Sequence, residues 1–191
     1  MAAARERWRR EVMPDLEPDR LIFLDETAAK TNMTRTHGYS PKGERLAAAA
    51  PHGHWNTTTV IGALRSEGFI APLVIDGALT GELFVAYVEQ VLAPELRPGD
   101  VVVMDNLSCH HVAGVEAAIR AVGCRVEYLP PYSPDLNPIE NAFSKLKRLL
   151  RTAAERTRDG LWRTIGWAMD QFTPPECKNY FRHCGYAATP M

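Results

Sequence analysis

Long apolar runs, paired cysteines and a charge excess of either sign are all missing from this sequence of 191 residues. No apolar run approaches the roughly 18 residues that span a bilayer, and the N-terminal segment MAAARERWRR has no hydrophobic signal core. The 4 cysteines form no CxxC pair, so a paired-cysteine zinc site is not indicated. The net charge of -1 provides no overall field that attracts nucleic acid. We therefore expect a cytoplasmic protein with reduced thiols and no membrane contact, in which any DNA contacts come from local basic patches.

The chain length suits a single domain. Residues 1–19 are charged and are interrupted by Pro14 and Pro18, so we expect a tail or a short helix before a domain that covers residues 20–191. Apolar and β-branched runs predict strands at 21–25, 57–64, 69–75, 101–105 and 125–129, with a further edge strand suggested at 45–50. Helical spacing predicts helices at 80–94, 112–122, 137–154, 159–172 and 174–184. This order of elements favours an α/β fold with a mixed sheet flanked by helices.

Three carboxylates stand at positions suited to binding divalent metal ions. Asp25 closes the apolar run LIFLD, Asp105 closes VVVMD, and Glu140 lies near the start of a basic helix, with 34 residues between Asp105 and Glu140. Side chains at the carboxyl ends of strands face the functional crevice of an α/β sheet. Clustered carboxylates repel one another unless cations neutralise them, and hard oxygen ligands favour Mg²⁺ or Mn²⁺. A pair of such ions activates water or a 3′ hydroxyl, which favours a nuclease or strand-transfer core.

The two aspartates also have simpler explanations. A solvated acid at the end of a strand accounts for Asp25 or Asp105 about equally well when each is taken alone. Asp76 has a similar context after the run FIAPLVI and is the strongest competing candidate. Because neighbouring side chains of a strand point to opposite faces, only one of Asp25 and Glu26 belongs to the site, and we expect it to be Asp25.

Glu140 has an alternative explanation as part of a helix cap. Asn137 as the N-cap, followed by Pro138 and Glu140, forms a near capping box. At about 100° per residue, however, Glu140 shares one helix face with Lys147 and Arg151. Charge runs are usually solvated helix faces, but this one lies beside the predicted metal site. We therefore expect Asn137, Lys147 and Arg151 to support the acids or to contact the DNA backbone.

Asn106 and His110 are further candidates because both lie close to Asp105. Asn106 is placed to orient a metal ligand or a phosphate, and His110 to support the site or contact the scissile backbone. The alternatives are a cap for the following helix and a solvent-exposed histidine. A phosphatase of the haloacid dehalogenase type is disfavoured, since that chemistry needs a second aspartate where Thr27 follows Asp25.

Three segments carry a family resemblance: LDE near the start, MDNLSCHH in the middle and LPPYSPDLNPIENAFSKLK towards the end. They resemble the DDE transposases of the mariner superfamily, especially the bacterial insertion-sequence branch, over residues 21–186. The resemblance implies a ribonuclease H-like fold in which Asp25, Asp105 and Glu140 bind two metal ions. It also implies a transposase that nicks DNA at transposon ends and joins the freed 3′ hydroxyl to target DNA.

The resemblance leaves the choice of DNA ends unexplained. Transposases of this superfamily carry N-terminal helix-turn-helix modules, whereas only about 20 residues precede the first predicted strand, too few for three helices. We expect no such domain in this chain, so the recognition half is encoded separately as a helix-turn-helix subunit, joined by frameshifting, or lost in a decayed element. We expect a homodimer to pair the two ends at the bacterial nucleoid. The alternative is a catalytically silent or domesticated fragment that binds DNA or a partner protein.

Overall fold

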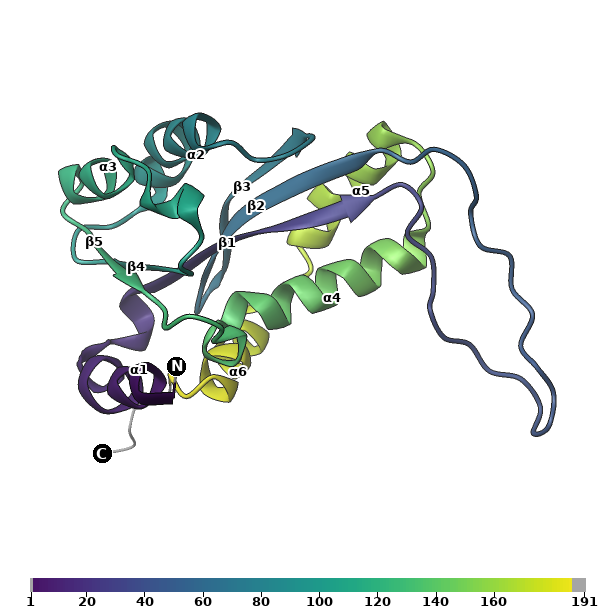
Figure 1. Ribbon diagram of the computed structural model, residues 1–191, viewed down its shortest axis with the longest axis horizontal. Coiled ribbons are helices and arrows are strands. Elements are labelled where there is room, and N and C mark those ends of the chain that lie inside the picture. The colour runs from purple at the N-terminus through teal and green to yellow at the C-terminus, as the bar shows by residue number, and fades with distance from the viewer. Residues whose placement is uncertain (1, 187–191) are drawn as a thin grey trace.

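A five-stranded mixed sheet forms the centre of the computed structural model, which describes residues 2–186 (Figure 1). The strands are β1 Leu21–Lys30, β2 Thr57–Arg65, β3 Gly68–Asp76, β4 Val101–Met104 and β5 Arg125–Tyr128. They lie in the order β3-β2-β1-β4-β5, with β2 antiparallel to β1 and β3, and with β4 parallel to β1 and β5. The predicted mixed sheet is confirmed, and its first strand lies at the centre.

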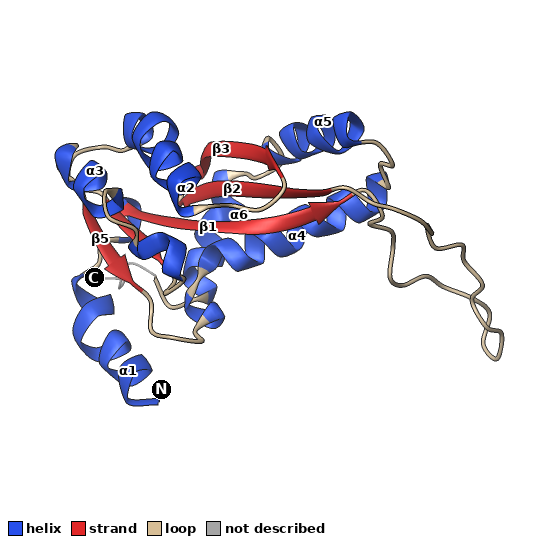
Figure 2. Ribbon diagram, turned by 45° about the horizontal axis from the view of Figure 1, so that its top comes forward, coloured by secondary structure: helices blue, strands red, loops and turns tan. Residues whose placement is uncertain are grey.

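Helices cover both faces of the sheet (Figure 2). They are α1 Ala2–Arg7, α2 Gly81–Tyr87, α3 Val115–Ala121, α4 Pro138–Ala153, α5 Arg158–Met169 and α6 Pro174–His183. One face is covered by α2 and α3, and the other by α4, α5 and α6 (Figure 1). Alternation along β1 explains the two layers, since Leu21 and Phe23 join the core beneath α4 while Ile22 and Leu24 join the core beneath α2. Every helix within residues 2–186 is too short or too polar to span a lipid bilayer.

The long helix α4 forms as its apolar spacing predicts. Its largest buried side chains are those of Ile139, Phe143, Leu146 and Leu150. They form one stripe with helical periodicity, which packs against the sheet. Because this stripe fixes the rotation of α4, Glu140 and Ser144 on another face remain exposed.

Three predictions about the elements were wrong. β1 continues to Lys30, so Asp25 lies in the middle of a strand instead of at its end, because β2 pairs with β1 as far as Lys30. Residues 45–50 form no strand; they belong to an exposed loop between β1 and β2 that projects from the body without a pairing partner (Figure 2). The helix predicted from residue 112 begins later. A 3₁₀ turn covers Ser108–His111, and α3 starts at Val115.

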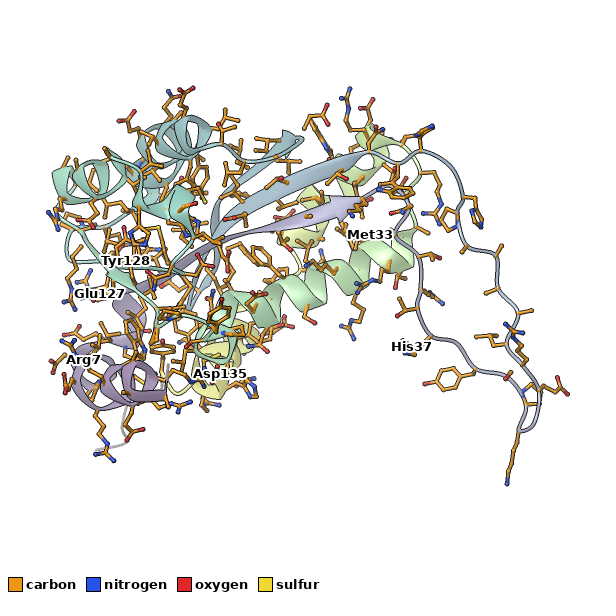
Figure 3. All side chains as sticks on the ribbon, viewed as in Figure 1. Arg7, Met33, His37, Glu127, Tyr128 and Asp135 are labelled. Carbon is orange, nitrogen blue, oxygen red and sulfur yellow. The ribbon has the colours of Figure 1, made fainter. Side chains whose placement is uncertain are left out.

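The N-terminal segment packs on the domain. Trp8 is buried, and its Nε1 donates a hydrogen bond of 3.1 Å to Tyr186 Oη, which donates in turn to Leu136 O at 2.9 Å. Figure 3 places Asp135 close to this segment, where its carboxylate accepts hydrogen bonds from the Arg5 guanidinium. A short helix thus precedes the first strand, and the segment that contains it contacts the rest of the domain.

Candidate active site

The three acids predicted as metal ligands line one cleft of about 470 Å³. Asp25 comes from the middle of β1, Asp105 follows the last residue of β4, and Glu140 lies in the first turn of α4. Because Phe23 pairs with Val103 in the parallel ladder, the two aspartates follow at the same level of neighbouring strands. The remaining lining consists of Asn106, Leu107, residues 129–134 and Asn137.

Asp25 is buried at the base of this cleft. Its Oδ1 accepts a hydrogen bond from the Glu26 N–H at 2.8 Å, and its Oδ2 accepts one from Asn137 Nδ2 at 2.9 Å. Burial raises the pKa of Asp25 to about 7; the Glu26 N–H opposes the rise, and the carboxylates of Asp105 and Glu140 add to it. A cation in the cleft would offset both the burial and the repulsion.

His110 connects Asp105 with Glu26 behind the cleft. Its Nδ1 lies 2.8 Å from Asp105 Oδ1, and its Nε2 lies 3.1 Å from Glu26 Oε2. Burial lowers the pKa of His110, but hydrogen bonds to the two carboxylates outweigh this and raise the pKa to about 10. Burial also opposes ionisation of Asp105, yet hydrogen bonds from His110 and the Leu107 N–H bring its pKa below the ordinary value. These contacts favour the carboxylate form of Asp105, whereas burial favours the protonated form of Asp25.

The predicted contact of His110 with a DNA backbone is wrong, because the side chain is fully buried. The expected alternative of a solvent-exposed histidine is wrong for the same reason. The ring instead contacts Asp105 directly and orients it. The other predicted role of His110, support of the site, remains a prediction. Glu26 points away from Asp25, as strand alternation predicts. Its contact with His110 was not anticipated, since 84 positions separate the two residues.

The start of α4 does not form the predicted capping box. The Asn137 side chain makes no cap hydrogen bond; its amide reaches across to Asp25, and its backbone N–H donates to Pro134 O. Within residues 2–186, the exposed Glu140 side chain makes no hydrogen bond, so a cap does not explain the glutamate. Asn137 Oδ1 is buried and has no partner in the same described range. An additional oxygen donor therefore stands beside Asp25.

The chemistry of the three acids suits hard divalent metal ions. Two oxygens that share one Mg²⁺ lie no more than about 4.2 Å apart, given metal–oxygen distances of about 2.1 Å. In the described part of the chain, the group of three potential ligands that lies within 4.8 Å is Glu26, Cys109 and His110, not the three acids. The acids are hard oxygen donors of the kind that Mg²⁺ and Mn²⁺ prefer. The cleft thus offers such ions a set of oxygen ligands.

Two other candidates have structural contacts of their own. Asp76, the competing acid, lies at the end of β3 outside the cleft and pairs with Arg158. Asn106 lines the cleft, but its side chain is occupied. Its Nδ2 donates to Leu129 O at 2.6 Å, and its Oδ1 lies 3.0 Å from His111 Nε2. Asn106 thereby ties the loop after β4 to the end of β5.

A basic surface continues along α4 away from the acids. Lys147 and Arg151 are half-buried on this helix. Arg148 and Arg151 meet Arg35 and His37 of the β1–β2 loop around a groove of about 240 Å³. Figure 3 shows His37 on this loop beyond the sheet. Sequence reasoning found the helix residues from their periodicity but missed the loop residues, because no pattern predicts where a long loop folds back.

The fold is shared with transposases of known structure. The chain is similar to the Mos1 strand transfer complex, with 15% identity and a TM-score of 0.71 over 96% of this chain and 55% of that chain. It is also similar to the Mos1 mariner paired end complex with Mn, with 16% identity and a TM-score of 0.71 over 96% and 56%. The chain is also similar to the catalytic domain of Mos1 mariner transposase, with 15% identity and a TM-score of 0.57 over 96% of this chain and 81% of that chain. These matches confirm the predicted ribonuclease H-like fold.

Sequence comparison identifies the family. No curated protein matches the chain significantly. The chain spans a little over half the length of the Mos1 chains in the DNA complexes, at 55% and 56%. Residues 20–161 match the family model described as DDE superfamily endonuclease. Because this match covers most of the sequence, the protein belongs to the DDE superfamily endonucleases.

Proposed function

We propose that the protein is the catalytic domain of a metal-dependent DNA transposase, which nicks transposon ends and joins the freed 3′ hydroxyl to target DNA. The observation that carries this proposal is the meeting of Asp25, Asp105 and Glu140 in one cleft. Family membership and the fold shared with the Mos1 strand transfer complex support the same reaction class.

Asp25, Asp105 and Glu140 would hold two Mg²⁺ or Mn²⁺ ions. Mos1 structures with Mg and with Mn support this choice of metal. When bound, such ions activate water or a 3′ hydroxyl and stabilise the departing oxygen. Asn137 fixes one oxygen of Asp25, and His110 fixes one oxygen of Asp105. Glu140 is exposed and makes no side-chain hydrogen bond within the described residues, so it is the acid best able to adjust when metal and DNA bind.

The basic surface beside the cleft would bind the DNA backbone. Lys147, Arg148 and Arg151 lie along α4, and Arg35 and His37 approach its far end from the loop. Phosphate contacts of this kind position DNA without reading its sequence. Because the net charge of the chain is -1, this local patch has to supply the attraction.

Recognition of the transposon ends would come from another unit. We assign it to a separate helix-turn-helix subunit, since reading base edges takes a helix that fits the major groove. A homodimer would bring two ends together, with one catalytic domain for each end. The assembly would act in the bacterial cytoplasm at the nucleoid.

A nicking and strand-joining assay tests the proposal, with Mg²⁺ or Mn²⁺ and DNA that carries the element's own ends. Supercoiled plasmid in Mn²⁺ serves as a second substrate that does not depend on end recognition. Asp105→Ala and Glu140→Ala should each abolish nicking and joining. Asp76→Ala is the matched control, because it removes an acid that lies outside the cleft.

The outcomes separate the proposal from its alternative. Loss of both products in the two cleft variants, with activity retained in Asp76→Ala, supports the catalytic assignment. Equal activity of Asp105→Ala and the wild type would overturn it. DNA binding without product from the wild type, with either metal and either substrate, would favour a catalytically silent DNA-binding fragment.

A further inference from the structure

A second group of metal-ligand side chains lies behind the acid cleft. Glu26, Cys109 and His110 each offer one ligand atom, and these atoms all lie within 4.8 Å of one another. Glu26 projects from β1 on the face opposite Asp25, and the other two residues come from the 3₁₀ turn after β4. This Glu-Cys-His group contains none of the three acids that line the cleft.

The ligand types of the Glu-Cys-His group favour a metal different from the one expected in the acid cleft. Thiolate and imidazole select Zn²⁺ and similar ions, whereas carboxylates alone suit Mg²⁺. Zinc–ligand distances of about 2.0 to 2.3 Å put tetrahedral ligand atoms roughly 3.3 to 3.8 Å apart. Since the three atoms already lie within 4.8 Å of one another, small side-chain movements suffice. Three protein ligands leave the fourth position of a tetrahedral ion for water.

His110 already has the support that metal-bound histidines usually have. Such histidines donate their other ring N–H to a carboxylate, which fixes the ring and its tautomer. Asp105 occupies this place at Nδ1, at 2.8 Å, and leaves Nε2 directed towards Glu26 at 3.1 Å. The ring also packs against Phe84 with centroids 4.7 Å apart, and Tyr128 Oη donates to His110 O at 3.2 Å. The imidazole is therefore held in place before any ion binds.

An ion pair alone would explain Glu26 and His110 but not the thiol. Cys109 is only half-buried, whereas Cys124, Cys177 and Cys184 are buried. Glu26 also keeps some exposure, at 19% of its side chain. Among residues 2–186, the Glu-Cys-His group is also the one set of three such side chains with metal-binding spacing. Because Cys109 and Glu26 are both partly exposed, an ion can approach the group from solvent.

We propose that Glu26, Cys109 and His110 form a binding site for a Zn²⁺-class ion, with a water molecule as the fourth ligand. The ion takes the place of the proton between His110 Nε2 and Glu26 and binds Cys109 as the thiolate, so both protons pass to solvent. His110 Nδ1 keeps its hydrogen bond to Asp105, and one imidazole then links the ion to the acid cleft. The site does not depend on the proposed transposase activity.

Cobalt is the probe, because its spectrum reports the ligands that bind it. The full chain is stripped of metal with a chelator and titrated with Co²⁺ under reducing conditions. The wild type should show thiolate-to-cobalt charge-transfer absorption in the near ultraviolet and the strong visible bands of a four-coordinate ion. Stoichiometric Zn²⁺ should remove both signals. Excess Mg²⁺ should leave them, because Mg²⁺ takes oxygen ligands.

Four variants locate the signal. Cys109→Ser should remove the charge-transfer band and weaken Zn²⁺ binding at least about tenfold. Glu26→Gln should weaken binding while the band remains. Cys124→Ser is the matched thiol control, and Glu140→Ala removes a cleft ligand; both should keep the wild-type spectrum. Circular dichroism checks that each variant is folded.

Two results would overturn the proposal. One is the lack of a charge-transfer band in the wild type at excess Co²⁺. The other is a band of unchanged intensity in Cys109→Ser, which would place the bound cobalt at another thiol. Neither result bears on nicking by the acid cleft, because the cobalt spectrum is read without DNA.

Discussion

The side-chain amide of Asn137 donates a hydrogen bond of 2.9 Å to Oδ2 of Asp25, a residue 112 positions earlier in the chain. This contact joins the start of α4 to the middle of β1. Because Asn137 makes no helix-cap hydrogen bond with its side chain, the amide serves Asp25 instead of the helix. The turn that presents Glu140 to the cleft thus also orients the buried acid.

We expect Asn137→Ala to weaken Mn²⁺ binding roughly 10- to 100-fold, because loss of a group that orients a metal ligand has effects of this size. Isothermal titration calorimetry of the metal-free protein measures the affinity. Asn141→Ala is the control on the same helix, since within residues 2–186 the Asn141 amide makes only a contact of 3.6 Å with Cys184 Sγ. Unchanged Mn²⁺ affinity in Asn137→Ala would mean that the hydrogen bond does not hold Asp25 for metal.

The buried carboxyl of Asp25 should make the metal-free protein less stable at alkaline pH. Its pKa is about 7 in the folded protein, against about 3.9 in an unfolded chain. Between these values the folded state binds more protons than the unfolded state, so the free energy of unfolding falls as pH rises. Above pH 7 this loss of unfolding free energy is complete. It amounts to up to about 4 kcal/mol, because the pKa of Asp25 differs by about three between the folded and unfolded states.

Asp25→Asn isolates this effect, since it removes the charge and keeps a side chain of similar size. In chelator, urea unfolding should show the variant more stable than the wild type at pH 8 and the difference nearly absent at pH 4. Added Mg²⁺ should stabilise the wild type more than the variant at pH 8, because the variant lacks one carboxylate ligand. A constant difference between pH 4 and pH 8 would contradict the raised pKa.

The basic surface on α4 should determine the salt dependence of DNA binding. Lys147→Ala and Arg151→Ala should each weaken binding to all sequences alike, and each should reduce the slope of log K against log salt by about 1. Fluorescence anisotropy at several salt concentrations gives this slope. Lys178→Ala on α6 removes an equal charge from an exposed position and should leave the slope unchanged. Equal slopes in all variants would place the DNA elsewhere.

Local patterns were sufficient to predict much of the fold and of the cleft. The hairpin of β2 and β3 follows from two apolar runs around a short turn, and the apolar stripe of α4 follows from helical periodicity. Asp105 directly follows a short buried strand, close to the strand end that its sequence context indicates. In each case the residues that decide the structure are near neighbours in the chain.

The contacts that orient the acids depend on residues far apart in sequence, so they could not be predicted. The second half of β1 carries few apolar residues and is held in the sheet by β2, which is why Asp25 was expected at a strand end. The Asn137 side chain had a complete local explanation as a cap, and only the packing of α4 directs it to Asp25. The bridge from Glu26 to His110 depends in the same way on how β1 and the turn after β4 are packed.

Trp8 should stabilise the domain by holding the N-terminal segment against the loop that precedes α4. Its side chain is 4% exposed and contacts Tyr186, which donates to Leu136 O immediately before Asn137. We expect Trp8→Ala to lower the free energy of unfolding by about 3 to 5 kcal/mol. Trp8→Phe should cost less, because it keeps most of the buried ring and loses only the indole N–H. Urea denaturation measures both, and Arg7→Ala, whose side chain is 75% exposed, should change stability by no more than about 0.5 kcal/mol. Equal stability of Trp8→Ala and the wild type would show that this segment is not part of the cooperative folding unit.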